Sequence, residues 1–157
     1  MTAEIIAVGS ELLTPQHTDT NSLFLTRELN KCGIQVVRKT IIGDDSERLA
    51  KEIRQARQSS GLVILTGGLG PTLDDVTRYA ASNAVDCALM YHDHIVELIR
   101  ERFVRRGRKM AEVNRRQGYI LAGADILANA NGTAPGQWLE DEIGILILLP
   151  GPPRELE

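Results

Sequence analysis

The sequence has few aromatic residues, few cysteines and no long apolar run. Phenylalanine, tryptophan and tyrosine make up only 4% of the 157 residues, so the hydrophobic core must be mainly aliphatic. The two cysteines, Cys32 and Cys87, lie far apart and form no CxxC pair, which predicts reduced thiols rather than a disulfide framework. No apolar run approaches the roughly 20 residues that a membrane-spanning helix needs, so we expect no membrane partner.

The chain also lacks a strong charge of either sign and a leader-like N-terminus. Its formal net charge is -3, whereas nucleic-acid-binding domains are usually basic, so we expect no nucleic-acid partner. The first residues, MTAEIIAVGSELL, lack the basic and long apolar segments of a signal peptide. Together these absences predict a cytoplasmic protein.

What is present is the composition of an ordinary globular domain. Hydrophobic residues make up 43% and charged residues 25% of a chain whose length suits a single core. The sequence stops at PGPPRELE, where a helix is expected to begin. We therefore expect residues 1–157 to form one domain that is truncated at its C-terminal end.

Short apolar segments alternate with amphipathic ones along the chain. Strands are expected at 4–9, 34–42 and 61–67, and helices at 20–33, 46–59, 72–85, 92–107 and 110–121. The last third is expected to hold strands and turns, with a hairpin over 134–151 that turns near 140–144. This order predicts an α/β three-layer sandwich with a mostly parallel sheet.

Three of the expected strands end in unusual loops, with the sequences VGSELL, TGGLGPTLDD and LLPGPP. Ligands of open parallel sheets bind beyond the carboxyl ends of the strands, so we expect these loops to converge on one site. The candidate ligand-binding residues in the three loops are Gly9, Ser10, Glu11, Thr66, Gly67, Gly68, Gly70, Thr72, Pro150 and Gly151.

The middle loop carries three glycines within four positions, Gly67, Gly68 and Gly70. Residues without a Cβ let backbone amides approach an anion, and a helix starting at Thr72 would favour negative charge at its N-terminus. The pattern is neither a Walker A loop nor GxGxxG, and it is also typical of a tight strand-to-helix turn. The sequence leaves a phosphate cradle and a simple turn as alternatives.

Two adjacent aspartates, Asp74 and Asp75, follow the glycines. Carboxylates beside a bound phosphate would repel it unless a cation lies between them, and Mg²⁺ commonly bridges carboxylates to substrate phosphates. Asp75, Asp74 and Glu11 are therefore candidate metal ligands, and the two aspartates are candidate catalytic residues. The alternative for the aspartates is capping, because Thr72-x-x-Asp75 matches a helix start. The alternatives for Glu11 are hydrogen bonds from a base or ribose, or a loop charge in solvent.

Residues 100–116 contain eight basic and two acidic residues. This segment is either a solvated helix face or a rim that attracts phosphate, with Asn114, Arg115 and Arg116 as candidate contacts. The turn-rich segment NGTAPG adds Gly132 and Thr133 as candidates. In TDTNS, Asp19 and Asn21 are expected to cap a helix, with contact to the ligand as the alternative.

Six segments, AVGSELL, DTNS, VILTGGLGPTLDDVTR, EVNRRQ, NANGTAPG and LPGPPREL, occur in this order. As a set they resemble the N-terminal domains of the competence/damage-inducible CinA family, which has the MoaB/MogA-like molybdopterin-binding fold. The resemblance covers nearly the whole chain and implies a three-layer α/β fold with its site at the glycines. Molybdopterin adenylyltransferases of this fold have a functional aspartate before Val-Thr, and the resemblance assigns that position to Asp75.

The resemblance also implies a function. CinA-type domains are associated with hydrolysis of ADP-ribose to AMP and ribose 5-phosphate, assisted by a divalent metal such as Mg²⁺, Mn²⁺ or Co²⁺. The alternatives are molybdopterin binding and adenylylation, or a binding and dimerisation module without catalysis. In each case the expected partner is a small nucleotide or pterin, and we expect a homo-oligomer. Family members usually carry a C-terminal deamidase domain, which residues 1–157 do not resemble, so we expect no deamidase activity.

Overall fold

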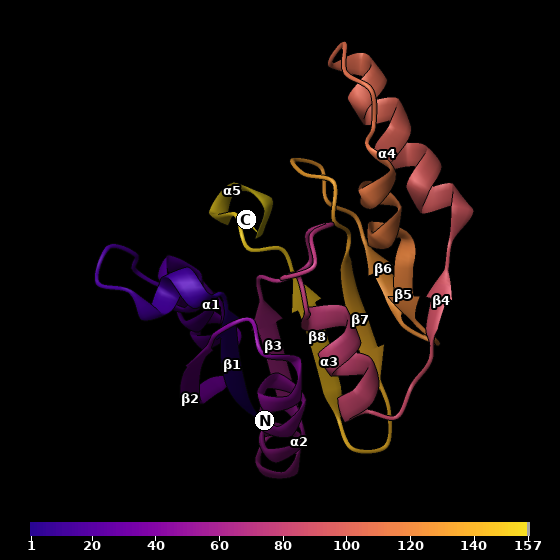
Figure 1. Cartoon of the computed structure of the whole chain (residues 1–157). Helices are drawn as coiled ribbons and strands as arrows, with labels where there is room; N and C mark the ends of the chain where they lie inside the picture. Colours follow the sequence, from indigo (N-terminus) through magenta and orange to yellow (C-terminus); the bar gives the residue numbers. More distant parts are fainter. Residues whose placement is uncertain (157) are drawn as a thin grey trace.

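The computed structural model describes residues 1–156, in which helices cover both faces of a six-stranded sheet (Figure 1). The strand order is β2-β1-β3-β8-β7-β6. The first four of these strands run parallel to one another, and β7 and β6 complete the sheet as antiparallel neighbours, which confirms the predicted mostly parallel sheet. The strands are β1 (Thr2–Val8), β2 (Gln35–Ile42), β3 (Leu62–Thr66), β6 (Asp125–Leu127), β7 (Gly136–Glu140) and β8 (Ile145–Leu149).

Alternating side chains of the central strands supply the cores on the two faces of the sheet. In β1, Ile6 and Val8 face the layer formed by α2 and α3, while Ala3 and Ile5 face α1 on the other side. This alternation follows from the two-residue repeat of a strand and gives the predicted three layers. The helices are α1 (Thr20–Lys31), α2 (Ser46–Ser59), α3 (Thr77–Ala84), α4 (Asp93–Arg105) and α5 (Pro153–Leu156).

The predicted start of the third helix at Thr72 is wrong, because α3 begins at Thr77. The intervening residues form an irregular loop in which the Asp75 carboxylate accepts hydrogen bonds from the amides of Gly70 and Thr72. These bonds hold the backbone in a turn rather than in a helical spiral. Asp75 therefore does not act as the predicted helix cap, and Val76 stands at the N-cap position without a side-chain hydrogen bond.

The short helix predicted within 110–121, running into a connection, is confirmed only in part. The segment forms the 3-10 helix η2 (Glu112–Gly118), followed by strand β5 (Tyr119–Leu121), which pairs antiparallel with β4 (Leu89–Tyr91). Three-residue strands are too short to show alternation in the sequence, so both were missed. The long helix α4 packs on this small sheet and on η2, away from the central sheet (Figure 1).

The hairpin predicted near the C-terminus is confirmed. Strands β7 and β8 are joined by a turn in which Asp141 and Gly144 exchange backbone hydrogen bonds. The short helix α5 then starts at Pro153, as PGPPRELE predicts. None of the helices within residues 1–156 combines the length and the apolarity that crossing a membrane requires.

Candidate functional site

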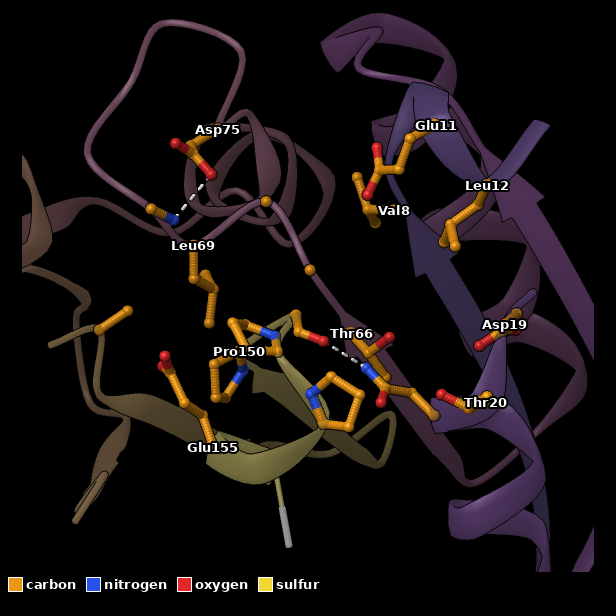
Figure 2. A pocket seen from close by; sticks show the side chains of 18 of the residues that line it. Val8, Glu11, Leu12, Asp19, Thr20, Thr66, Leu69, Asp75, Pro150 and Glu155 are labelled. Atoms are coloured by element: carbon orange, nitrogen blue, oxygen red, sulfur yellow. Dashed lines mark hydrogen bonds between the residues drawn. The ribbon is translucent and has the colours of Figure 1, made fainter. Parts of the chain in front are cut away.

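A pocket of about 550 Å³ lies where β1, β3 and β8 end (Figure 2). The register of these parallel strands places their carboxyl ends side by side, so the three loops predicted to converge do meet here. Such a volume is typical of a small-molecule site. The pocket is lined by nine of the candidate residues, namely Glu11, Thr66, Gly67, Gly68, Gly70, Asp75, Thr133, Pro150 and Gly151.

One wall of this main pocket is formed by residues 67–72, which we call the glycine loop. Gly67 has a φ of 95°, and a Cβ at this position would come within 2.3 Å of the Val8 carbonyl oxygen. Gly68 has a φ of 65°, and its Cβ would come within 2.3 Å of the Thr77 hydroxyl. Both conformations favour glycine, and both positions leave no room for a side chain. The glycines are therefore explained by a tight turn packed between β1 and α3, and that same turn forms a wall of the main pocket.

The Asp75 carboxylate holds this loop together. It accepts hydrogen bonds from the Gly70 amide at 2.7 Å, from the Thr72 amide at 2.8 Å and from the Thr72 hydroxyl at 2.6 Å. A Cβ on Gly70 would come within 2.5 Å of it, which explains the third glycine. Both carboxylate oxygens are thus engaged by the loop. Asp74 is exposed and does not line the main pocket.

A buried cation, Arg78, lies behind the glycine loop. Its side chain extends from the first turn of α3 and donates to the carbonyl oxygens of Leu69 at 2.5 Å and Gly70 at 2.7 Å. Burial lowers the pKa of this guanidinium to about 10, although the nearby Asp75 carboxylate opposes the shift, so Arg78 is charged at neutral pH. The sequence reasoning missed it, because an arginine early in a helix usually reaches solvent.

The N-terminus of α1 forms the opposite wall. Asp19 caps the helix by accepting from the Ser22 amide, as predicted, and Asn21 donates to the Gly151 carbonyl at 2.7 Å. This second bond ties the start of α1 to the loop after β8. Asp19 and Asn21 both line the pocket, and sequence reasoning predicted their contact with the ligand only as an alternative. The other lining residues that were not predicted as site residues are Val8, Leu12, His17, Thr18, Thr20, Leu69, Pro71, Gln117, Ala134, Pro152, Pro153 and Glu155.

Several candidates lie outside the main pocket. The Ser10 hydroxyl and amide bond to Asp44, and Asn114 donates to Gln117. The residues that do not line the pocket are Gly9, Ser10, Thr72, Asp74, Asn114, Arg115, Arg116 and Gly132. Gly132 packs against the Glu155 carboxylate and Gly9 against the Glu11 carboxylate. A Cβ at either glycine would collide with that carboxylate.

The residues of the predicted basic rim do not line the main pocket. Arg115 donates to the Tyr91 hydroxyl at 3.1 Å, which raises the pKa of its guanidinium, and Arg116 donates to the Thr72 carbonyl on the outside of the glycine loop. Arg102 and Arg105 of α4 line a separate cavity of about 270 Å³.

The three predicted metal ligands do not form a preassembled centre. No group of three or more His, Cys, Asp or Glu residues within 1–156 could hold a metal ion. Asp75 is engaged by the glycine loop, and Asp74 is exposed and does not line the main pocket. Glu11 alone fits the prediction, because its carboxylate lines the main pocket and forms no hydrogen bond or ion pair with any described residue (Figure 2).

Comparisons with known proteins agree with this architecture. The sequence pattern of the family described as "Probable molybdopterin binding domain" matches residues 4–157. A CinA-like protein from Solibacter usitatus is 55% identical over 157 residues, which is 100% of this chain but 38% of that relative's length. The chain thus spans about two fifths of this curated relative.

Two solved structures are similar in fold. The crystal structure of the protein CinA with unknown function from Thermoplasma acidophilum has a TM-score of 0.91 at 29% identity, covering 99% of this chain and 92% of that chain. The tungsten cofactor synthesizing protein MoaB from Pyrococcus furiosus has a TM-score of 0.61 at 16% identity, covering 99% and 84%. These similarities confirm the predicted MoaB/MogA-like fold.

Proposed function

Since this chain belongs to the molybdopterin-binding domain family, alongside CinA-like and competence-damage inducible proteins, we propose that its main pocket binds a small phosphorylated molecule. The observation that carries the proposal is the buried, charged Arg78 directly behind the glycine loop. Gly68 and Leu69 line the pocket, and their amides have no acceptor among residues 1–156. Backbone amides in front of a positive charge suit an anion.

The second support is the shape of the pocket. The glycine loop and the N-terminus of α1 face each other across a space large enough for a nucleotide-sized ligand. Helix N-termini favour negative charge, and α1 has twelve residues to contribute its dipole. A ligand with two linked phosphates could contact both walls, with the rest of the molecule against Leu12, Leu69 and the prolines after β8.

We propose further that the reaction is hydrolysis of the phosphoanhydride in ADP-ribose. Water adds to one phosphorus atom, and the bridging oxygen leaves with the other phosphate, which yields AMP and ribose 5-phosphate. The glycine loop and α1 would orient the two phosphates. Glu11 would hold a divalent cation together with phosphate oxygens, since Mg²⁺ often binds through one carboxylate plus substrate phosphates. Such a cation would neutralise part of the ligand's charge.

A second candidate function is favoured by the family itself. Its description as a molybdopterin-binding domain points to a pterin as the ligand, with either binding alone or ATP-dependent adenylylation as the outcome. The same anion-binding wall would then hold the phosphate of the pterin. The homo-oligomer expected from the sequence stays a prediction, whichever of the two functions the protein has.

The test is chromatography of ADP-ribose incubated with the protein and Mg²⁺, Mn²⁺, Co²⁺ or a chelator. We expect release of AMP that requires a metal and falls at least tenfold in Glu11→Gln. The matched control is Glu47→Gln, an exposed glutamate in the first turn of α2 outside the main pocket, which should keep its rate. A folded protein that releases no AMP with any metal would exclude the hydrolase, and labelling of a pterin with ATP would establish adenylylation.

A further inference from the structure

Arg78 is a buried arginine whose side chain bonds to backbone carbonyls instead of a carboxylate. The residue is 2% exposed, and its side chain donates to two acceptors among the described residues, the carbonyls of Leu69 and Gly70, neither of which is a carboxylate. Its Nε atom is buried and has no partner among the described residues. Buried charges are normally paired with an opposite charge. The positive charge of Arg78 is therefore compensated only by carbonyl dipoles and, at longer range, by Asp75.

Arg78 and Asp75 hold the same peptide unit from opposite sides. The carbonyl of Leu69 accepts from Arg78, and the amide of Gly70, in the same peptide plane, donates to Asp75 at 2.7 Å. The carbonyl and amide of a trans peptide point in opposite directions, so this pair of bonds fixes the orientation of the plane. The next carbonyl, of Gly70, is drawn to Arg78 as well.

We propose that Arg78 is a positioning residue for the phosphates of the ligand, an inference that rests on the proposed function. It holds the carbonyls of Leu69 and Gly70 toward the protein interior, so that their negative ends do not face the bound anion. It also places a positive charge behind the amides of Gly68 and Leu69. Arg78 thus acts through the glycine loop and need not touch the ligand.

The chain offers a matched control for this proposal. Arg57 is another buried arginine, 7% exposed, but it pairs with Asp141 at 2.6 Å beside the β7–β8 turn, at the opposite end of the sheet from the main pocket. It too has a buried guanidinium nitrogen without a partner. Replacing either arginine removes a buried charge and two hydrogen bonds, but only Arg78 contacts the glycine loop.

The experiment is calorimetric titration of inorganic pyrophosphate into the wild-type protein, Arg78→Met, Arg78→Lys and Arg57→Met, with circular dichroism to check folding. We expect Arg78→Met to weaken binding at least tenfold and Arg57→Met to change it less than twofold. Arg78→Lys keeps the charge but lacks the planar fork that reaches two carbonyls, so we expect a loss of about threefold to tenfold. In the ADP-ribose assay, Arg78→Lys should raise KM more than it lowers kcat.

The outcomes separate this inference from the proposed function. Suppose that the wild-type protein binds pyrophosphate and that Arg78→Met and Arg78→Lys bind it with the same affinity. This result would overturn the positioning role of Arg78 and leave the proposed anion pocket intact. Equal losses in Arg78→Met and Arg57→Met would also overturn it, because the effect would then be a general loss of structure. If Arg78→Met does not fold, Arg78→Lys decides, and wild-type affinity in that variant overturns the role. No binding by the wild-type protein would overturn both the pocket and the role of Arg78.

Discussion

The Asp75 carboxylate gathers three donors of the glycine loop, two amides and the hydroxyl of Thr72. Hydrogen bonds to a charged group each contribute about 1.5–3 kcal/mol, and an asparagine offers only one accepting oxygen in place of two. We therefore expect Asp75→Asn to lower the free energy of unfolding by roughly 2–4 kcal/mol, measured by urea denaturation without ligand or metal.

The neighbouring aspartate is the control for this prediction. Asp74 is exposed and makes no hydrogen bond through its side chain to any described residue, so Asp74→Asn should change stability by less than about 0.5 kcal/mol. If Asp75 served only to bind a metal, its removal would leave the metal-free protein as stable as before. Equal stabilities of the two variants would thus restore the metal-ligand interpretation.

The same two residues show how far single positions could be interpreted from the sequence. The DD pair indicated that carboxylates accompany the glycines, and the structure places one of them against the loop. The sequence could not show which donors Asp75 would meet, because the bend between Gly70 and Thr77 is held by hydrogen bonds from the loop to Asp75 and from Arg78 to the loop. Arg78 was missed for a related reason, since its burial is set by the same bend.

Among elements, β1 and β3 approach each other closely beside the main pocket, where Gly67 lies against the Val8 carbonyl. A Cβ there would overlap an oxygen of the backbone, and the φ of 95° is itself unfavourable for other residues. We expect Gly67→Ala to cost roughly 2–5 kcal/mol, the sum of overpacking and a left-handed conformation. Thermal unfolding would measure it.

Gly33 provides the comparison for this substitution. It follows α1 with a φ of 74°, and a Cβ at this position would meet nothing within 4 Å. Gly33→Ala should therefore cost only the conformational part, roughly 1–2 kcal/mol. A Gly67→Ala variant as stable as Gly33→Ala would mean that the ends of β1 and β3 can separate without penalty.

The elements that could be predicted are those whose periodicity is long enough to recognise. The central strands alternate between two buried faces, and α1, α2 and α4 repeat apolar residues over three or more turns. The short strands β4 and β5 hold three residues each and depend on each other across the chain, so no local pattern marks them. The start of α3 at Thr77 depends on the loop bonds to Asp75, which are equally invisible in a local pattern.

At the scale of the whole molecule, the ion pairs of Glu4 and Asp141 lie at the opposite end of the sheet from the main pocket. The pocket lies at the carboxyl ends of the parallel strands, whereas Glu4 and the Arg57–Asp141 pair lie near their amino ends. Glu4 is 3% exposed and accepts hydrogen bonds from Ser59, Ser60 and Arg38. Acid should therefore weaken the protein at the end away from the main pocket.

This separation leads to a prediction about pH. Burial raises the pKa of Glu4, but hydrogen bonds from Ser59, Arg38 and Ser60 outweigh it and hold the pKa below its usual 4.5. For Asp141, burial also raises the pKa, but the hydrogen bond and charge of Arg57 together with the Ile143 and Gly144 amides outweigh it, so the pKa lies below the usual 3.8. Because the folded forms bind protons less readily than the unfolded chain, the stabilisation is complete above these ordinary values and is lost as the pH falls through the lowered ones.

We expect the free energy of unfolding to fall steadily below about pH 4.5, and Glu4→Gln to show a smaller fall than the wild-type protein over the same range. Glu142→Gln, at an exposed position in the β7–β8 turn, should follow the wild-type curve. Urea denaturation at a series of pH values, without ligand, would measure all three proteins. Parallel curves for Glu4→Gln and wild type would show that the acid sensitivity arises elsewhere.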